Sequence, residues 1–151
     1  MTPLYSETIV EHFRHPRNYG ALPAPEVAYE AVNALCGDRI RMELNVSADQ
    51  TITAVRFRGD SCIISRAAAS ILTELIQGQT LQEVSTLPQD MLLTALHTTI
   101  RPARMKCALL PLHILQAGLA LYLRFLLVSD PRDVPRQHVC ARRDCYDNRW
   151  R

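Results

Sequence analysis

One stretch decides the fold: residues 38–62 read DRIRMELNVSADQTITAVRFRGDSC. Apolar residues alternate with charged or polar ones over residues 40–46, which is the pattern of a strand with one buried face. The polar segment 47–50 predicts a turn, and residues 52–58 return with valine and phenylalanine on one face. We therefore expect an antiparallel hairpin in the first half of the chain.

The period of the apolar residues changes directly after this hairpin. From Cys62 onward they recur at helical spacing, and Gly78 is a typical helix C-terminal signal. Thr80 and Glu83 have the spacing of a capping box, in which two side chains bond each other's backbone N–H groups, and they predict a short helix. A second short helix is expected over residues 88–96.

Helices are also predicted on both sides of this region. Apolar residues four apart predict a helix over about residues 4–14, which the turn-forming segment HPRNYG at residues 15–20 ends. Pro102 has the position of a first-turn proline ahead of a long apolar helix that reaches about Leu123. We expect Pro111 to kink that helix or to make its first segment irregular, because proline has no backbone N–H.

The composition is typical of one domain with its own core, since the chain has 151 residues and 48% hydrophobic content. The formal net charge is +2, and the sequence has no glycine–arginine tract, so we expect no nucleic-acid partner. The longest strongly apolar stretch, residues 117–128, is too short to span a bilayer, and residues 1–7 lack the features of a signal peptide. We therefore expect a cytoplasmic protein with reduced cysteines and no membrane association.

Three of the five cysteines have neighbours that indicate a functional role. Cys36 and Cys62 each lie within three residues of a glycine, which lets the backbone approach an ion closely. Cys62 and Cys107 are predicted near helix N-termini, where free amides lower the pKa of a thiol, and Lys106 adds a positive charge. Together with Asp38, the three thiols form a tetrahedral set for Zn²⁺ or a thiolate-rich site for iron.

Each of these residues also has a purely structural interpretation. Cysteine is often buried, so Cys62 is compatible with core packing, Asp38 with a turn former and Lys106 with a solvated helix residue. His113 lies well off the helix face of the third cysteine, and we interpret it as a core or surface histidine. A redox switch with a disulfide between Cys36 and Cys62 is a further alternative, although the chain has no C-x-x-C motif.

The end of the chain differs from the rest in composition. Residues 129–151 are rich in arginine, aspartate and proline, so we divide the chain into a folded domain at 1–128 and a polar tail that packs poorly. Cys140 and Cys145 lie in this tail with His138 nearby. A metal site there lacks a fourth ligand, so we interpret them as bystanders, with a metal or disulfide role as the alternative.

Several motifs occur in the order and spacing of one known family. They are HPRNYG at 15–20, CGD at 36–38, GDSC at 59–62 and PARMKCAL at 102–109. On these motifs the chain resembles the IscU/SufU/NifU N-terminal family of iron–sulfur cluster assembly proteins over roughly residues 4–121. The resemblance implies an α+β fold, a small antiparallel β-sheet with helices packed on one face, which agrees with the predicted hairpin and helices.

The resemblance also implies a ligand set and a function. In that family three cysteines and one aspartate hold a nascent [2Fe–2S] cluster, or Zn²⁺ in its place, and the thiols accept sulfur from a cysteine desulfurase. The matching positions are Cys36, Asp38, Cys62 and Cys107. We expect a scaffold that accepts sulfur, assembles a transient [2Fe–2S] cluster from iron and passes it to recipient apo-proteins. The alternative is a zinc-dependent persulfide acceptor, a sulfurtransferase without stable cluster binding. A scaffold or sulfur acceptor is expected rather than a true enzyme, as a monomer or weak homo-oligomer.

The residue before the third cysteine bears on this choice. IscU-type members of the family have a histidine there, whereas SufU-type members have a lysine, as here at Lys106. SufU-type members also carry an insertion before this motif, for which residues 78–101 leave no room. The chain is therefore closest to the SufU-type branch but lacks its insertion. The lysine favours the zinc-dependent acceptor, and the missing insertion favours the cluster scaffold.

Overall fold

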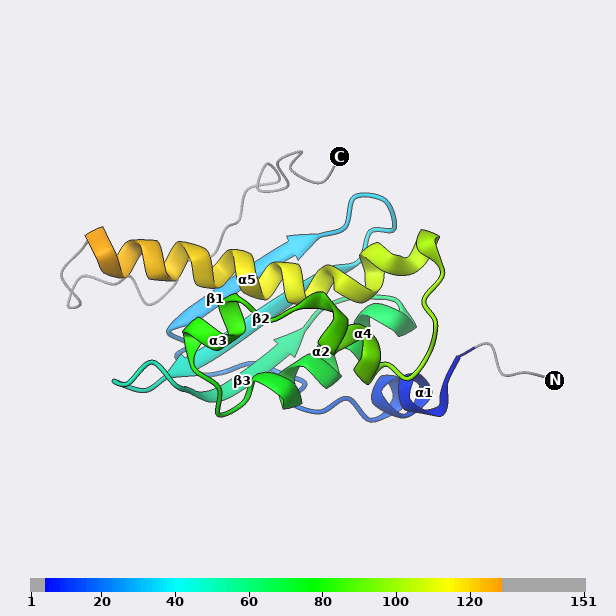
Figure 1. Ribbon diagram of the computed structural model, residues 1–151, viewed down its shortest axis with the longest axis horizontal. Coiled ribbons are helices and arrows are strands. Elements are labelled where there is room, and N and C mark those ends of the chain that lie inside the picture. The colour runs from blue at the N-terminus through cyan, green and yellow to red at the C-terminus, as the bar shows by residue number, and fades with distance from the viewer. Residues whose placement is uncertain (1–4, 129–151) are drawn as a thin grey trace.

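An antiparallel sheet forms one layer of the protein, and helices form the other. The computed structural model describes residues 5–128. The strands are β1 (Val27–Val32), β2 (Arg39–Val46) and β3 (Ile52–Arg58), and they lie in the order β1-β2-β3 (Figure 1). Strands β2 and β3 confirm the predicted hairpin.

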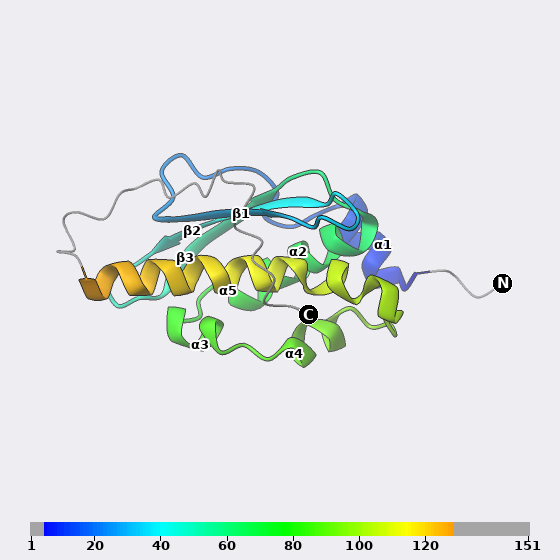
Figure 2. The same cartoon turned by 90° about the horizontal axis from the view of Figure 1, so that it is seen from above.

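The helices lie on one side of this sheet, as the view in Figure 2 shows. They are α1 (Glu7–Arg14), α2 (Ile63–Ile76), α3 (Leu81–Ser85), α4 (Gln89–Ala95) and α5 (Met105–Val128), with a 3₁₀ turn, η1 (Pro102–Arg104), before α5. Helices α2 and α5 pack on the sheet, α1 packs on α2, and α3 and α4 pack on α5. The predicted α+β fold with helices on one face is confirmed.

The pairing register of β2 and β3 gathers the large apolar side chains on the helix-covered face. Met42 lies opposite Phe57, and Leu44 lies opposite Val55. All four side chains are at most 2% exposed. Because successive side chains point to opposite faces of a sheet, a shift of one residue would turn this apolar set away from the helices. The alternating pattern thus determines which face carries the core.

The sequence pattern does not predict the edge strand β1. It pairs with β2, with Tyr29 opposite Met42. Alternation is weak in this segment, and its alanines and glutamate are poor strand formers. Helix α5 packs closely against this strand at Gly118. A Cβ on Gly118 would lie 2.8 Å from the Cβ of Tyr29. Pairing and packing, rather than local propensity, therefore make this segment a strand.

Side-chain caps mark two of the predicted helix starts. The Ser6 hydroxyl accepts a hydrogen bond from the Ile9 N–H (3.3 Å), so α1 begins at Glu7, later than the apolar pattern indicates. Thr80 and Glu83 form both halves of the predicted capping box at the start of α3. Each cap satisfies backbone N–H groups that have no acceptor within the helix.

Helix α5 is longer than the pattern predicts, and it is unbroken at Pro111. It continues to Val128 instead of ending near Leu123, and with η1 it is long and apolar enough to cross a membrane by length and composition alone. The expectation concerned only residues 117–128, which are the last part of this longer helix. The first half of α5 is nevertheless buried in the core, where Ala108 and Leu112 are completely inaccessible to solvent. The irregular segment expected at the proline lies earlier, at η1.

The other face of the sheet is crossed by the connector between α1 and β1 (Figure 2), which Glu43 fastens in place. Glu43 is buried, and one of its oxygens lies 2.6 Å from Arg41 and 3.3 Å from Arg58. The other oxygen accepts the N–H of Leu22 in the connector (2.7 Å). Burial alone would raise the pKa of Glu43, but these hydrogen bonds and the two arginine charges hold it below its ordinary value of 4.5.

We predict that Glu43→Gln lowers the free energy of unfolding by about 2 kcal/mol at neutral pH, because hydrogen bonds to a charged group are stronger than neutral ones. A carboxylate with a lowered pKa stabilises the folded state above its unfolded-state pKa, and this contribution is lost as the pH falls through the folded-state pKa. The gap between parent and variant should therefore narrow on acidification below the ordinary glutamate pKa. Urea denaturation over a pH series measures it.

Glu30→Gln is the matched control on the neighbouring strand. Glu30 is partly exposed and lies 4.0 Å from Arg39, so its replacement should change the free energy of unfolding by no more than about 0.5 kcal/mol. Equal losses in the two variants, or a loss in Glu43→Gln that does not change with pH, would contradict the assigned role of Glu43.

Candidate metal centre

The turn between β1 and β2 carries two of the predicted ligands, Cys36 and Asp38. Backbone hydrogen bonds close this turn, since Asn33 N–H donates to the Asp38 carbonyl and Gly37 N–H donates to the Asn33 carbonyl (both 2.7 Å). Gly37 has a φ of +74°, a conformation that glycine adopts without strain. As a result the Cys36 side chain lies at the surface, whereas Asp38 is only 6% exposed.

A close backbone approach brings the third ligand, Cys62, to this turn. Gly59 lies against the backbone of Arg39, and a Cβ on Gly59 would be 2.0 Å from the Arg39 carbonyl oxygen. One residue further on, the Asp60 carbonyl accepts the Arg39 N–H (2.7 Å). The end of β3 is thereby held on the start of β2. Only glycine fits at this crossing, which explains its place in the motif before Cys62.

Cys62 is the N-cap residue of α2, as the sequence predicts. Its sulfur accepts the N–H of Ser65 (3.5 Å), and its own N–H donates to Asp38 Oδ1 (2.9 Å). The start of α2 and the carboxylate are therefore tied together directly. This bond directs a free amide at a helix N-terminus toward a negative charge, where it stabilises that charge most.

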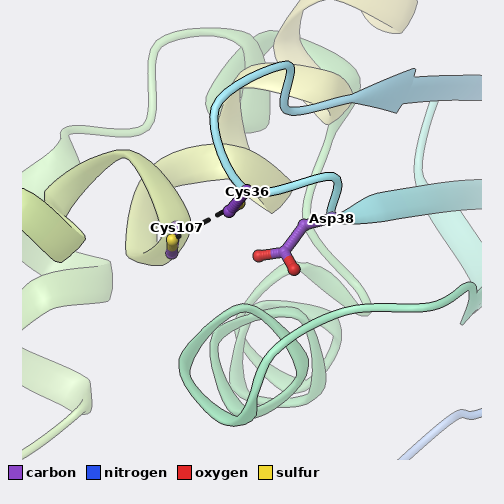
Figure 3. A group of neighbouring side chains, drawn as sticks. All are labelled: Cys36, Asp38 and Cys107. Carbon is purple, nitrogen blue, oxygen red and sulfur yellow. Dashed lines mark hydrogen bonds between the residues drawn. The ribbon is translucent and has the colours of Figure 1, made fainter.

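Cys107, the third residue of α5, completes the candidate centre from the other side. Its sulfur lies 3.8 Å from the sulfur of Cys36, and Figure 3 shows the two cysteines, joined by a dashed line, beside the carboxylate of Asp38. One ligand atom from each of these three residues lies within 4.8 Å of the other two. Among the described residues the sulfur of Cys62 is not part of this close group, although Cys62 adjoins it through Asp38.

The spacing of the two sulfurs fits a tetrahedral metal ion. Two thiolates bound to zinc at about 2.3 Å in tetrahedral geometry lie about 3.8 Å apart. The sulfurs of Cys36 and Cys107 already have this separation. The soft thiolates and one carboxylate are a donor set that zinc and iron both accept.

Hydrogen bonds keep Asp38 ionised inside the protein. Burial raises its pKa, but bonds from the side chains of Ser65, Cys36 and Cys62 and from the Cys62 N–H together bring it below the ordinary value of 3.8. The carboxylate is therefore a ready ligand at neutral pH. No protonation change is needed before it binds a cation.

Cys107 corrects the expectation that a helix start lowers the pKa of its thiol. Burial, followed by the charge of Cys62 and the contact with Cys36, raises the pKa of Cys107 to about 12. The side chain is only 3% exposed, so loss of solvation outweighs the helix amides. Cys107 therefore keeps its proton until a cation binds, and binding releases that proton.

Arg104 is a further positively charged residue that interacts with Cys107. A hydrogen bond to Cys107 and the charges of Cys107 and Cys62 raise the pKa of Arg104. This pairing requires the thiolate, so it forms once the proton of Cys107 has left. Lys106 is exposed. Arg104 lies one helical turn before Cys107, and that spacing is the signal in the sequence that points to it.

Ser65 is a second site residue that sequence reasoning missed. Its hydroxyl lies 2.6 Å from Asp38 Oδ2 and 3.0 Å from the carbonyl oxygen of Cys107, and the residue is completely buried. A serine on the core-facing side of an otherwise apolar helix was the available signal. Of the remaining predictions, His113 contacts Gln89 (3.2 Å), while Cys140, Cys145 and His138 lie outside the described residues.

Comparison with known families agrees with the resemblance of the sequence motifs. Residues 4–126 match the NifU-like N terminal domain. The chain therefore belongs to the family of NifU-like N-terminal domains.

Particular relatives fall into two groups. The zinc-dependent sulfurtransferase SufU of Bacillus subtilis is 32% identical, with 78% of this chain and 90% of that protein covered. The iron–sulfur cluster assembly scaffold protein IscU of Azotobacter vinelandii is 30% identical, with 78% and 93% covered. Among solved structures, a putative iron–sulfur cluster assembly scaffold protein for the SUF system from Fervidobacterium islandicum superposes with a TM-score of 0.68 at 27% identity over 76% of this chain and 96% of that chain.

We predict that Gly59→Ala weakens zinc binding and lowers the free energy of unfolding by about 1–3 kcal/mol more than Gly20→Ala does, because the added methyl group overlaps the Arg39 carbonyl. Gly20 also has a positive φ, of +135°, but nothing lies within 4 Å of a Cβ there. The control thus carries a similar backbone strain without the overlap. Equal losses, with zinc binding unchanged in both variants, would show that the close approach does not position Cys62.

Proposed function

We propose that this protein takes part in iron–sulfur cluster assembly, as a scaffold that accepts sulfur from a cysteine desulfurase, assembles a [2Fe–2S] cluster and passes it on. One observation carries the proposal: thiols of Cys36 and Cys107 from distant segments meet beside the carboxylate of Asp38 at the spacing of a metal site. The relative named as an IscU scaffold supports the same function. Cys62 is the proposed fourth ligand.

The four ligands differ in how firmly they would hold iron. Thiolates are soft ligands that suit iron–sulfur chemistry, whereas the carboxylate of Asp38 is hard and is the weakest partner of the set. Its buried hydrogen bonds also give it a stable position when it is not bound to a metal ion. Asp38 is therefore the ligand proposed to detach when the cargo is handed over.

The exposure of the thiols indicates where sulfur is first accepted. All three cysteines are candidates, but Cys36 lies at the surface whereas Cys107 is buried. In sulfur transfer an acceptor thiolate attacks the outer sulfur of the donor's persulfide, a new S–S bond forms, and the donor cysteine leaves as a thiolate. A large donor protein can bring its persulfide to Cys36 without opening the core. We therefore assign the first acceptance to Cys36.

A zinc-dependent persulfide acceptor is the second candidate function. The relative named as a zinc-dependent sulfurtransferase favours it, as does Lys106. In this case Cys36, Asp38, Cys62 and Cys107 would hold Zn²⁺, which keeps thiols deprotonated at neutral pH. Metal and acid-labile sulfide content after anaerobic purification separates the two functions. Iron with sulfide supports the scaffold, and one zinc without sulfide supports the acceptor.

The remaining parts of the proposal concern partners and setting. The partners are a cysteine desulfurase as sulfur donor and apo-proteins as recipients of the cluster. The site needs reduced thiols, which is consistent with a cytoplasmic location. The protein is proposed to act as a monomer or weak homo-oligomer. The folded unit is proposed to be residues 1–128, and residues 129–151 are not needed for the site.

We predict that Cys36→Ser, Cys62→Ser and Cys107→Ser each abolish cluster assembly or sulfur transfer, because water or serine replaces a thiolate poorly on a soft metal. Loss of zinc should also lower the melting temperature, since the metal binds only the folded state. Cys140→Ser and Cys145→Ser are the controls and should leave both properties intact. Full metal binding by Cys62→Ser at equal protein concentration would exclude Cys62 from the ligand set.

We predict that Asp38→Ala holds a reconstituted cluster longer than the parent protein. Each detachment of the carboxylate opens the metal to an incoming ligand, and the variant lacks this exchange step. The decay of the cluster's visible absorption in the presence of a chelator measures the lifetime. A shorter lifetime in the variant would show that Asp38 is a retaining ligand rather than the exchangeable one.

A further inference from the structure

A single hydrogen atom is shared between two parts of the candidate centre. The Ser65 hydroxyl lies within hydrogen-bond distance of both Asp38 Oδ2 (2.6 Å) and the Cys107 carbonyl oxygen (3.0 Å). Both of these atoms are acceptors only, and a serine hydroxyl has one hydrogen to donate. Ser65 can therefore satisfy Asp38 or Cys107 at any moment, but not both.

Pro111 makes the Cys107 carbonyl depend on this serine. In an α-helix a carbonyl accepts the N–H of the residue four positions later, which for Cys107 is position 111. Proline has no N–H, so the usual donor is missing. Ser65, which reaches the carbonyl from α2, stands in its place. The proline inside α5 therefore leaves an acceptor that the buried serine on α2 can satisfy.

We propose that Ser65 is a positioning residue that moves its hydrogen between the Asp38 carboxylate and the Cys107 carbonyl as Asp38 leaves or joins the bound metal. This inference rests on the function proposed above, because it requires Asp38 and Cys107 to be metal ligands. It adds a residue that sets how readily Asp38 detaches.

The direction of the exchange follows from the strengths of the two hydrogen bonds. The bond to ionised Asp38 is the shorter one, and a charge-assisted bond is stronger than a bond to a neutral carbonyl. Without metal, Ser65 therefore stays on Asp38. When Asp38 shares an electron pair with a metal ion it accepts hydrogen bonds less well, and the Cys107 carbonyl then becomes the better acceptor.

The consequence is that Ser65 stabilises the detached carboxylate more than the bound one. Together with the Cys62 N–H, the hydroxyl receives Asp38 when it leaves the metal. When Asp38 binds the metal again, the hydroxyl can donate to the Cys107 carbonyl instead. This second bond reduces the free-energy cost of losing the bond to Asp38. Ser65 therefore makes Asp38 exchangeable while the neighbouring thiolates stay in place.

The first test is the zinc affinity of Ser65→Ala, measured on the full chain by competition with a chromogenic chelator. The dissociation constant should fall about fivefold, because the variant loses a charge-assisted bond in the free site but only a neutral one in the loaded site. Ser70→Ala is the matched control. Ser70 is also completely buried on α2, but its hydroxyl bonds the Arg17 N–H (2.8 Å) and His12 (2.8 Å) instead of a ligand. Its zinc affinity should match that of the parent.

The second test is Pro111→Ala, which restores an N–H for the Cys107 carbonyl and removes no buried polar group. The Cys107 carbonyl then already accepts a hydrogen bond, so Ser65 gains less free energy by moving its hydrogen from Asp38 to this carbonyl. Zinc should therefore bind more weakly than in the parent. In a Ser65→Ala background the same substitution should have no effect on zinc affinity, which a purely structural role of Pro111 would not produce. The absorption of Co²⁺-loaded protein checks that the ligand set is unchanged. If Ser65→Ala fails to fold, the zinc affinity of the single variant Pro111→Ala tests the inference.

The outcomes separate this inference from the proposed function. Tighter zinc binding in Ser65→Ala, or weaker binding in Pro111→Ala that disappears in the double variant, supports the exchange. Weaker zinc binding in Ser65→Ala would mean that Ser65 only orients Asp38 toward the metal, which overturns the inference and leaves the site intact. A parent protein that binds neither zinc nor iron would overturn the site itself and the inference with it.

Discussion

The backbone after β3 comes very close to the start of β2 at Gly59, and the placement of Cys62 beside Asp38 depends on that close approach. The absence of a side chain lets the end of β3 lie on the start of β2, where the Arg39 N–H bonds the Asp60 carbonyl (2.7 Å). The chain then enters α2 directly beside the turn that carries Asp38. The Cys62 N–H therefore meets the carboxylate, and the helix cap and the metal-binding turn become one unit. Helix α5 adds Cys107 by packing on α2 and the sheet.

The centre combines ligands that carry a charge with ligands that do not. Asp38 is ionised and satisfied by hydrogen bonds, whereas burial keeps the proton on Cys107. Without a metal ion, the buried thiol of Cys107 therefore adds no negative charge beside the carboxylate. A bound cation changes this charge state, because it stabilises the thiolates and competes with the hydrogen-bond donors for the carboxylate of Asp38. The pairing of Arg104 with Cys107 belongs to that charged state.

Local patterns in the sequence predict much of this fold, and they fail where tertiary contacts decide. The hairpin, the start of α2 at Cys62 and the capping box at Thr80 each have a strong local signal, and the structure confirms them. Strand β1 has weak alternation and exists because β2 and α5 bind it. Helix α5 runs through Pro111, where local propensity predicts a disturbance, and the Ser65 hydroxyl from α2 lies 3.0 Å from the Cys107 carbonyl that the proline leaves without its usual donor.

The candidate site divides in the same way. The motifs around Cys36, Asp38 and Cys107 suggest ligands, and the structure brings these three together. The role of Ser65 depends on which segments face α2, because its partners Asp38 and Cys107 come from a turn and from another helix, and no spacing within α2 contains that information. The high pKa of Cys107 likewise follows from burial by the rest of the fold, which outweighs the local effect of a helix start.

The number of sulfur atoms around a bound metal decides most directly whether these residues act as one site. X-ray absorption at the zinc edge measures it on the zinc-loaded full chain. We expect three sulfur neighbours at about 2.3 Å and one oxygen at about 2.0–2.2 Å, from Cys36, Cys62, Cys107 and Asp38. A shell with two sulfur atoms or fewer, unchanged in Cys62→Ser, would contradict a centre built from three thiols and one carboxylate.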